Sequence, residues 1–433
     1  MRLPTDPEHF ARALRQGLGR CVVLLRSGAD VGPYRETLEN AFRADQGYDP
    51  QCEGSRAAYV FDLACAAHLE AELRSAAGEG LVADSGQWDA EQHAGVLVRF
   101  AQRGDVSAAE LLRSRLASIP LDSPSLYSVA EFVAVLDGLA GVLLVARRLG
   151  EGADEPTHHA ACAYHLSLAA ESLGGEPVEV ALREAAASEP RVAAFLRFAE
   201  AGRRGPRAPR TPDPQTTLDE MFATIAANPR HTRPWLAAMR WGRTAAPQAL
   251  ALAAARLATC TEPGTARVLL GVFRKAPYPG PTEVLFRLAR SPDVALSRAA
   301  IAVLAARTSP EVRDEALRLL AQPKPEWEAL SLLSRNYEVG DGERVAPLLA
   351  QVQSGPQDEI HRIGSALLDA FSGDARGADV IAPLKWLYEE GHCSVCRLQV
   401  IEALLKHQAL DSETAAECRW DSNADIRQLN GIA

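Results

Sequence analysis

A short sequence pattern that occurs twice constrains the fold of this chain more than any other feature. The segment Val345–Leu348, with sequence VAPL, returns as Ile381–Leu384, with sequence IAPL, after a shift of 36 residues. Each copy is followed by a loop and then by an apolar helical segment that begins near an arginine, Arg362 in the first copy and Arg397 in the second. Internal repeats of about 20–50 residues are typical of stacked helix pairs, because one pair cannot bury its apolar face alone.

Arginines near the starts of apolar segments extend this repeat toward the N-terminus. Arg267, Arg298, Arg362 and Arg397 are separated by 31, 64 and 35 residues, and the middle interval corresponds to about two units. We therefore expect the missing unit at 327–333. The sequence predicts an all-α fold, a superhelical solenoid of stacked antiparallel helix pairs.

Two prolines and three residue pairs in these units resemble the HEAT repeat family, whose members are armadillo-like α-solenoids. The prolines, Pro347 and Pro383, stand in the first helix of a unit. The pairs stand where the second helix opens: Asp293 with Arg298, Asp358 with Arg362, and Cys393 with Arg397. The resemblance implies that the aspartate and arginine of a unit form a structural ladder between repeats, although Cys393 replaces the aspartate in one copy. It is good over 265–405, whereas over 1–200 it rests on paired amphipathic helices alone.

A proline-rich segment divides the chain. The segment Gly202–Thr217 contains four prolines in 16 residues, which is incompatible with a regular helix. We predict an N-terminal helical region of divergent repeats over 1–200, a Pro/Arg-rich linker over 201–217, and a HEAT-like repeat region over 218–433.

Composition narrows the class of protein. Four basic residues are lysines and 42 are arginines, which we interpret as a GC-rich, bacterial coding background. The net charge of −10 disfavours a general nucleic-acid or membrane binder. Glu131 and Asp137 interrupt the most apolar region, Val129–Leu149, so we expect no membrane span. The cysteines are scattered and the N-terminus lacks an apolar signal core, so the expected location is cytoplasmic.

Motifs that carry chemistry are scarce. No Gly-rich phosphate loop, HExxH or GxSxG motif is visible, so we expect no cofactor and favour a protein that is not an enzyme. Cys393 and Cys396 form a CxxC pair, but Cys396 falls within an apolar helical segment, so packing is favoured over zinc binding. His158, His159 and His165 stand near a helix start, and His158 and His165 share one helix face. We expect an exposed pair, His158 and His159, and a packed His165 rather than a metal site.

A segment rich in arginine and tryptophan follows the linker. Between Ala201 and Arg243 there are eight arginines and three acidic residues. Guanidinium groups beside indole rings suit stacking, phosphate contacts or an acidic protein partner. The candidate partner-binding residues here are Arg230, Arg233, Trp235, Arg240, Trp241 and Arg243. Pairing with the surplus acids of the chain itself is the alternative.

A polar loop gives a second candidate surface. Tyr48, Asp49, Glu53 and Arg56 lie within nine residues, and loops on rigid scaffolds often bind partners. A structural turn in which Arg56 pairs with the two acids fits the same residues.

The repeat and the lack of catalytic motifs together favour an interaction scaffold or regulator that holds another protein on its concave surface. The alternative is a nucleic-acid-binding or DNA-repair protein of the HEAT-like kind that uses the Arg/Trp segment 230–243. The two hypotheses differ in whether the purified chain retains nucleic acid at low salt.

Overall fold

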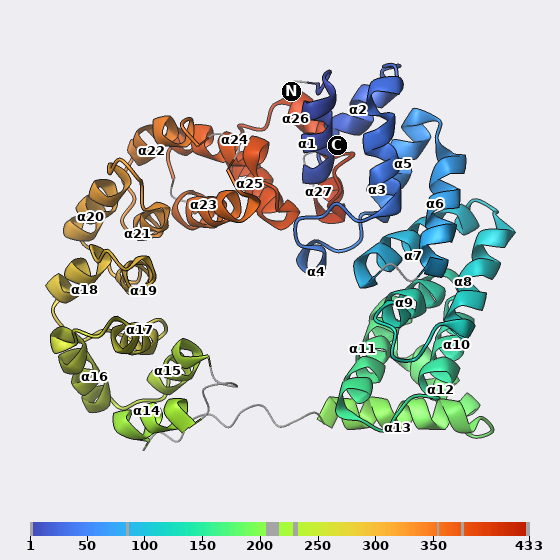
Figure 1. The fold of residues 1–433 in the computed structure, drawn as a ribbon, viewed down its shortest axis with the longest axis horizontal. Coiled ribbons are helices and arrows are strands. Elements are labelled where there is room, and N and C mark those ends of the chain that lie inside the picture. Colours follow the sequence, from blue (N-terminus) through green and yellow to red (C-terminus); the bar gives the residue numbers. More distant parts are fainter. Residues whose placement is uncertain are drawn as a thin grey trace. The chain divides into compact units, whose positions relative to one another are not determined.

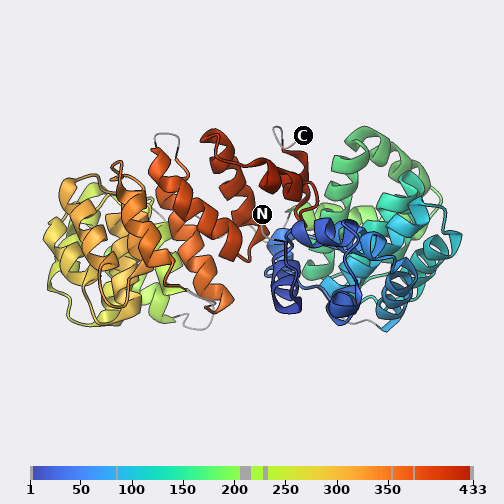
Figure 2. The ribbon, with the colours of Figure 1, turned by 90° about the horizontal axis from the view of Figure 1, so that it is seen from above.

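Helices account for all the regular secondary structure in the part of the chain that the computed structural model describes, and no strand occurs there (Figures 1 and 2). The described residues are 3–83, 86–204, 216–227, 233–352, 355–373 and 376–429. The prediction of an all-α fold is confirmed. Most of the predicted linker, 205–215, lies outside the described residues, and its first four residues belong to a helix that ends at Arg204.

The chain divides into two compact units. Unit 1 comprises 1–208 together with 392–398 and 410–433, and unit 2 comprises 209–391 together with 399–409. One helix, α25 (Ser394–Lys406), contributes its first residues to unit 1 and the rest to unit 2.

Unit 1 is built from helices at both ends of the sequence. Its helices are α1 (Pro7–Gln16), α2 (Arg20–Arg26), η1 (Gly32–Tyr34), α3 (Arg35–Arg43), α4 (Pro50–Glu53), α5 (Ala57–Ala67), α6 (Glu70–Ala83), α7 (Gln87–Gln102), α8 (Val106–Ser118), α9 (Ser125–Asp137), α10 (Leu139–Leu149), α11 (Pro156–Leu173), α12 (Gly175–Ala186), α13 (Pro190–Arg204), α26 (Ser412–Cys418) and α27 (Ala424–Gln428). Helix α7 packs against α5, α6, α8 and α9, and α11 packs against α9, α12 and α13. Leu97 and Val133 are fully buried between α7 and α9.

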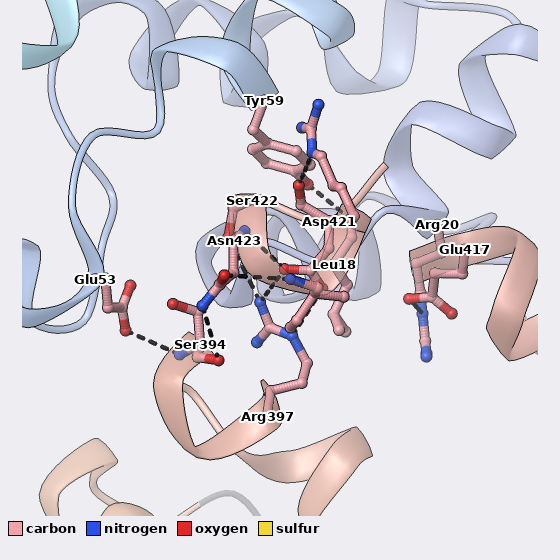
Figure 3. A network of polar contacts seen from close by, with 12 residues as sticks. Leu18, Arg20, Glu53, Tyr59, Ser394, Arg397, Glu417, Asp421, Ser422 and Asn423 are labelled. Atoms are coloured by element: carbon pink, nitrogen blue, oxygen red, sulfur yellow. Dashed lines mark hydrogen bonds and ion pairs between the residues drawn. The ribbon is translucent and has the colours of Figure 1, made fainter. Parts of the chain in front are cut away.

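The C-terminal segments complete the first helices of unit 1, and the polar contacts between them are shown in Figure 3. The amide of Ser422 donates to the carbonyl of Gly17 at 2.8 Å. The guanidinium of Arg20 donates to the buried carboxylate of Glu417 at 2.7 Å. Helices α1 and α2 therefore lie beside α26 and α27, and residues nearly 400 positions apart form one core.

A glycine makes this close approach possible. A Cβ atom at Gly19 would lie 2.0 Å from the carbonyl oxygen of Glu417 and 2.9 Å from the backbone of Trp420. No side chain fits there unless the backbone shifts, because real Cβ contacts are longer. Position 19 must therefore be glycine, because a segment from the other end of the sequence packs directly against its backbone.

Unit 2 contains the helices in which the repeat was recognised. They are α14 (Leu218–Ala227), α15 (Pro234–Gly242), α16 (Pro247–Thr259), α17 (Pro263–Val272), α18 (Thr282–Ala289), α19 (Val294–Leu304), α20 (Pro310–Leu320), η2 (Trp327–Ala329), α21 (Leu330–Leu333), α22 (Asp341–Leu349), α23 (Gln357–Phe371), η3 (Ala378–Val380) and α24 (Ile381–Glu390). Helices α15, α17, α19, α21 and α23 form one row, in which each contacts the next (Figure 1).

The repeated sequence pattern occupies comparable places in two successive helix pairs. Pro347 lies inside α22, and Pro383 lies in the first turn of α24, directly after η3. The predicted missing unit at 327–333 is present as η2 and α21. Its residues contact α19 on one side and α23 on the other.

Side-chain caps and arginine–carboxylate pairs define these helices and tie them together. Asp293 caps α19, since its Oδ1 accepts the amide of Leu296 at 3.0 Å. Arg313 binds both carboxylate oxygens of the buried Asp341, at 3.1 and 2.6 Å. Such pairs join consecutive helix pairs, because the partners are 28 residues apart.

Candidate functional site

A groove of about 1070 Å³ lies along the row of helices in unit 2. Residues of α15, α17, α19, η2, α21 and α23 line it. On α19 its wall is made by Ala295, Ala299 and Ala302, which recur at the i, i+4, i+7 spacing of one helix face. Small side chains on that face leave room above the backbone, and this room forms the groove.

Helix α17 supplies the same kind of face, with one arginine on the helix and a second in the turn that follows it. Gly264, Val268 and Gly271 follow the same spacing and line the groove. Arg267 on α17 and Arg274, two residues after the end of the helix, also line it. Both arginines are exposed. Helix α17 and the turn after it therefore present two guanidinium groups beside a strip of small residues.

These two arginines differ from several others of unit 2 in their acidic neighbours. Neither Arg267 nor Arg274 forms an ion pair with a carboxylate in the described part of the chain. The guanidinium carbon of Arg274 instead lies 5.5 Å from the ring centroid of Trp235, which lines the groove and is 41% exposed. A guanidinium over an indole keeps its N–H groups in the ring plane available for a carboxylate.

Elsewhere in the groove, one carboxylate lies between two arginines. Glu328 Oε1 is 2.7 Å from Nε of Arg298 and 2.8 Å from Nε of Arg362. Both carboxylate oxygens of Glu328 and both Nε atoms are buried, yet within the described residues none makes an oriented hydrogen bond. The distances are those of ion pairs, but the N–H bonds are not directed at the oxygens. The cluster thus has unused hydrogen-bonding capacity.

A second carboxylate, that of Glu326, lies beside this cluster. Burial raises the pKa of Glu326 to about 7, and the neighbouring carboxylate of Glu328 adds to the increase. The neighbouring Arg298, 3.5 Å away, lowers the pKa but only partly offsets these effects. Asp369, at the α23 end of the groove, also has a pKa raised by burial. The groove is therefore basic along α17 and carries acids along η2 and α23.

The residues predicted in the Arg/Trp segment fall in different environments. Arg230 lies outside the described residues. Arg233, Arg240 and Arg243 are exposed, but none of the three lines the groove. Trp241 is 1% exposed and donates its indole N–H to the carbonyl of Thr216 at 2.7 Å.

Of this segment, Trp235 is therefore the residue that the structure places on the groove, and Trp241 is a core residue. The helical period separates them, because positions 235 and 241 lie on different faces of α15.

The predicted ladder residues have partners other than those that the resemblance implied. Asp293 caps its own helix, and Arg298 pairs with Glu326 and Glu328. Arg362 pairs with Glu328 and Glu359, whereas Asp358 lies in the first turn of α23. Arginines do connect successive helix pairs here, but the carboxylate with which both Arg298 and Arg362 pair is that of Glu328.

In unit 1, Arg397 is buried and binds both oxygens of the buried Asp421, at 2.8 and 2.9 Å. The acceptor follows α26, so this arginine also joins two helices of its own unit.

The Tyr48 loop is largely internal. Arg56 is buried, pairs with Glu53 at 2.7 Å and donates to the carbonyl of Arg15 at 2.7 Å. Glu53 also accepts the amide of Ser394 at 3.1 Å (Figure 3). Tyr48 and Asp49 are half-buried. Arg56 and Glu53 therefore hold α4 against the start of α25 within unit 1.

The CxxC pair lies at the start of α25. Cys393 and Cys396 are both buried, and their sulfur atoms are within 4.8 Å of each other. A hydrogen bond from Cys396 lowers the pKa of the Cys393 thiol to about 6, and backbone amides of the first helical turn contribute. Cys393 thus interacts with the start of α25, as Asp293 does with the start of α19.

Sequence reasoning found Arg298 and Arg362 but missed Arg274 and Glu328. The i, i+4, i+7 spacing of Arg267, Gly271 and Arg274 in the sequence was the available signal, although the helix ends at Val272. For Glu328 no local signal exists, since its partners are 30 and 34 residues away.

Comparison with known proteins gives no family assignment: no family model matches the chain, and neither does any curated protein. Among the described helices, none combines the length and the apolar character needed to cross a bilayer.

Proposed function

We propose that unit 2 is a protein-binding module whose groove holds an acidic segment of another protein. In this proposal the helix pairs of unit 2 form a HEAT-like solenoid, and the row from α15 to α23 is its binding face. The observation that carries the proposal is the pair of exposed arginines, Arg267 and Arg274, beside the exposed ring of Trp235. Carboxylates are the natural ligands of such groups.

The groove itself contains an example of the proposed contact. Glu328 is held between Arg298 and Arg362 as a carboxylate of a partner would be held by Arg267 and Arg274. The charge distribution agrees, because residues 233–310 contain eleven basic and three acidic side chains. An acidic segment that enters from the α17 end would meet the basic part of the groove first.

Selection from a random peptide library, with the full-length protein as bait, tests this function. The enriched peptides should be rich in Asp and Glu, and their affinities can be measured by fluorescence anisotropy. The double variant Arg267→Glu/Arg274→Glu should bind at least about 30-fold more weakly, since two attractive contacts become repulsive. Glu328→Gln should bind several-fold more tightly, because it frees two arginines.

The matched control is Arg240→Glu/Arg243→Glu, which makes the same change in net charge outside the groove. Its affinity should stay within about twofold of the wild type. Enrichment of neutral peptides, or equal losses in the two double variants, would show that the groove is not an acidic-peptide site.

Nucleic-acid binding is the second candidate, favoured by the same excess of basic residues in 233–310. Exposed Arg233, Arg240 and Arg243 would then contact phosphates. A mobility-shift assay at low and moderate salt separates the candidates. Retention of single- or double-stranded DNA or RNA that falls steeply with salt, and that is lost in the Arg240→Glu/Arg243→Glu variant, supports this alternative.

A further inference from the structure

Unit 1 contains a separate cavity of about 320 Å³ between α9, α10, α11 and α13. Its inner wall is apolar, with Val142, Val145 and Phe195 buried. Val135 and Leu173 line the cavity and are exposed, so they mark its opening. A cavity of this volume and composition is large enough for a small organic molecule.

One buried side chain in the wall has an unused polar atom. His165 is 5% exposed and lines the cavity, and its Nε2 atom is buried without a hydrogen-bond partner among the described residues. Burial lowers the pKa of this imidazole to about 4, so it is neutral at physiological pH. A buried polar atom without a partner costs free energy, and a ligand that bonds to it recovers that cost.

The cavity also has an acidic side without a basic neighbour. Glu131 lines it, and burial raises the pKa of its carboxyl group, which Tyr164 partly offsets by a hydrogen bond. Glu91 lies close enough to add repulsion, and its own pKa is raised to about 7 by burial first and by Glu131 second. Neither glutamate has an ion pair to a basic side chain in the described part of the chain.

We propose that this cavity binds a small primary amine whose body is apolar, with the ammonium group on Glu131 and the apolar part against Val142, Val145 and Phe195. The neutral imidazole of His165 accepts an N–H of the same ammonium group. A cation is the ligand charge that the site selects, because it supplies the positive partner that Glu131 and Glu91 lack. An anion would meet the carboxylate of Glu131 inside the cavity and is excluded.

Two probes of matched size test the proposal, 2-phenylethylamine and 2-phenylethanol, titrated into the full-length protein by isothermal calorimetry at low salt. The amine should bind at least about tenfold more tightly than the alcohol, as expected for one partly buried ion pair. Glu131→Gln should remove this difference and leave the alcohol affinity unchanged. Glu184→Gln, an exposed position on α12, is the matched control and should have no effect.

Location is tested by Val135→Trp, which blocks the opening without altering the buried wall and should reduce amine binding at least about tenfold. Circular dichroism of each variant confirms that it is folded. The proposal is overturned if neither probe binds, if both bind equally to the wild type, or if a folded Val135→Trp variant binds the amine unchanged. If the cavity fails these tests while the acidic-peptide assay succeeds, the function proposed for unit 2 is unaffected.

Discussion

The buried ion pair between Arg397 and Asp421 gives the sharpest test of how unit 1 is assembled. The side chain of Arg397 is 1% exposed and that of Asp421 is fully buried. Asp421 accepts two guanidinium N–H bonds, at 2.8 and 2.9 Å, and the amide of Asn423 at 2.9 Å. The substitution Asp421→Asn keeps the shape of the side chain, but it removes the charge and turns one acceptor into a donor that faces a guanidinium.

The substitution should destabilise unit 1, because it leaves the buried guanidinium of Arg397 without a charged partner. An uncompensated charge in a buried site destabilises a protein by about 3–5 kcal/mol, whereas replacing both partners by apolar residues costs far less. For a unit of this size, that corresponds to a decrease in Tm on the order of 10 °C. The double variant Arg397→Met/Asp421→Leu should be more stable than Asp421→Asn, although the amide of Asn423 then lacks its acceptor.

Thermal unfolding followed by circular dichroism measures the shift, and hydrogen exchange locates it. Helices α26, α27, α1 and α2 should lose protection first, because they meet at this contact (Figure 3). The control is Glu179→Gln, whose partner Arg183 forms an ion pair in which both side chains are 67% exposed, and its Tm should change by less than about 1 °C. A Tm for Asp421→Asn as close to the wild type as that of the control would refute the reasoning.

Two further predictions concern unit 2. Trp241→Ala should destabilise unit 2 by about 3–5 kcal/mol, since the ring is buried in the core. Trp235→Ala should leave the Tm nearly unchanged but weaken peptide binding to the groove. Thermal unfolding measures the first effect and fluorescence anisotropy the second. Because the pKa of Glu326 is raised to about 7, the folded state holds a proton between about pH 4.5 and pH 7 that the unfolded state has lost. The free energy of unfolding of unit 2 should therefore fall as pH rises through this range, and Glu326→Gln should remove that slope. A slope that persists in the variant contradicts this assignment.

The helices of unit 2 could be predicted because their signals are local. Apolar spacing, proline and cap residues determine each helix, and the interval between Arg298 and Arg362 was enough to predict a helix at 327–333. The completion of unit 1 by α26 and α27 could not be predicted. Arg20 and Glu417 are 397 residues apart, and nothing near either residue encodes the other. Their charges and the small size of Gly19 are visible in the sequence only as isolated facts.

The candidate site was predicted in part for the same reason. Trp235 was identified by its arginine neighbours, but so was Trp241, which is in the core. The sequence shows that tryptophan and arginine are neighbours, whereas the helix face on which each side chain lies depends on where α15 begins and what it packs against. The pairing of Glu328 with two arginines depends on the stacking of three helices, so it requires the structure.

In a chain with so many arginines, a cluster of them is weak evidence for a binding site, and their partners must be considered. Many arginines of this protein are engaged internally: Arg313 binds a buried aspartate, and Arg307 donates to the carbonyl of Tyr278 at 2.7 Å. Arg267 and Arg274 differ because they line a groove, and in the described part of the chain neither forms an ion pair with a carboxylate. Their neighbours Arg298 and Arg362 form ion pairs with Glu328 inside unit 2, whereas Arg267 and Arg274 do not. The two unpaired guanidinium groups therefore favour an acidic ligand from outside the chain.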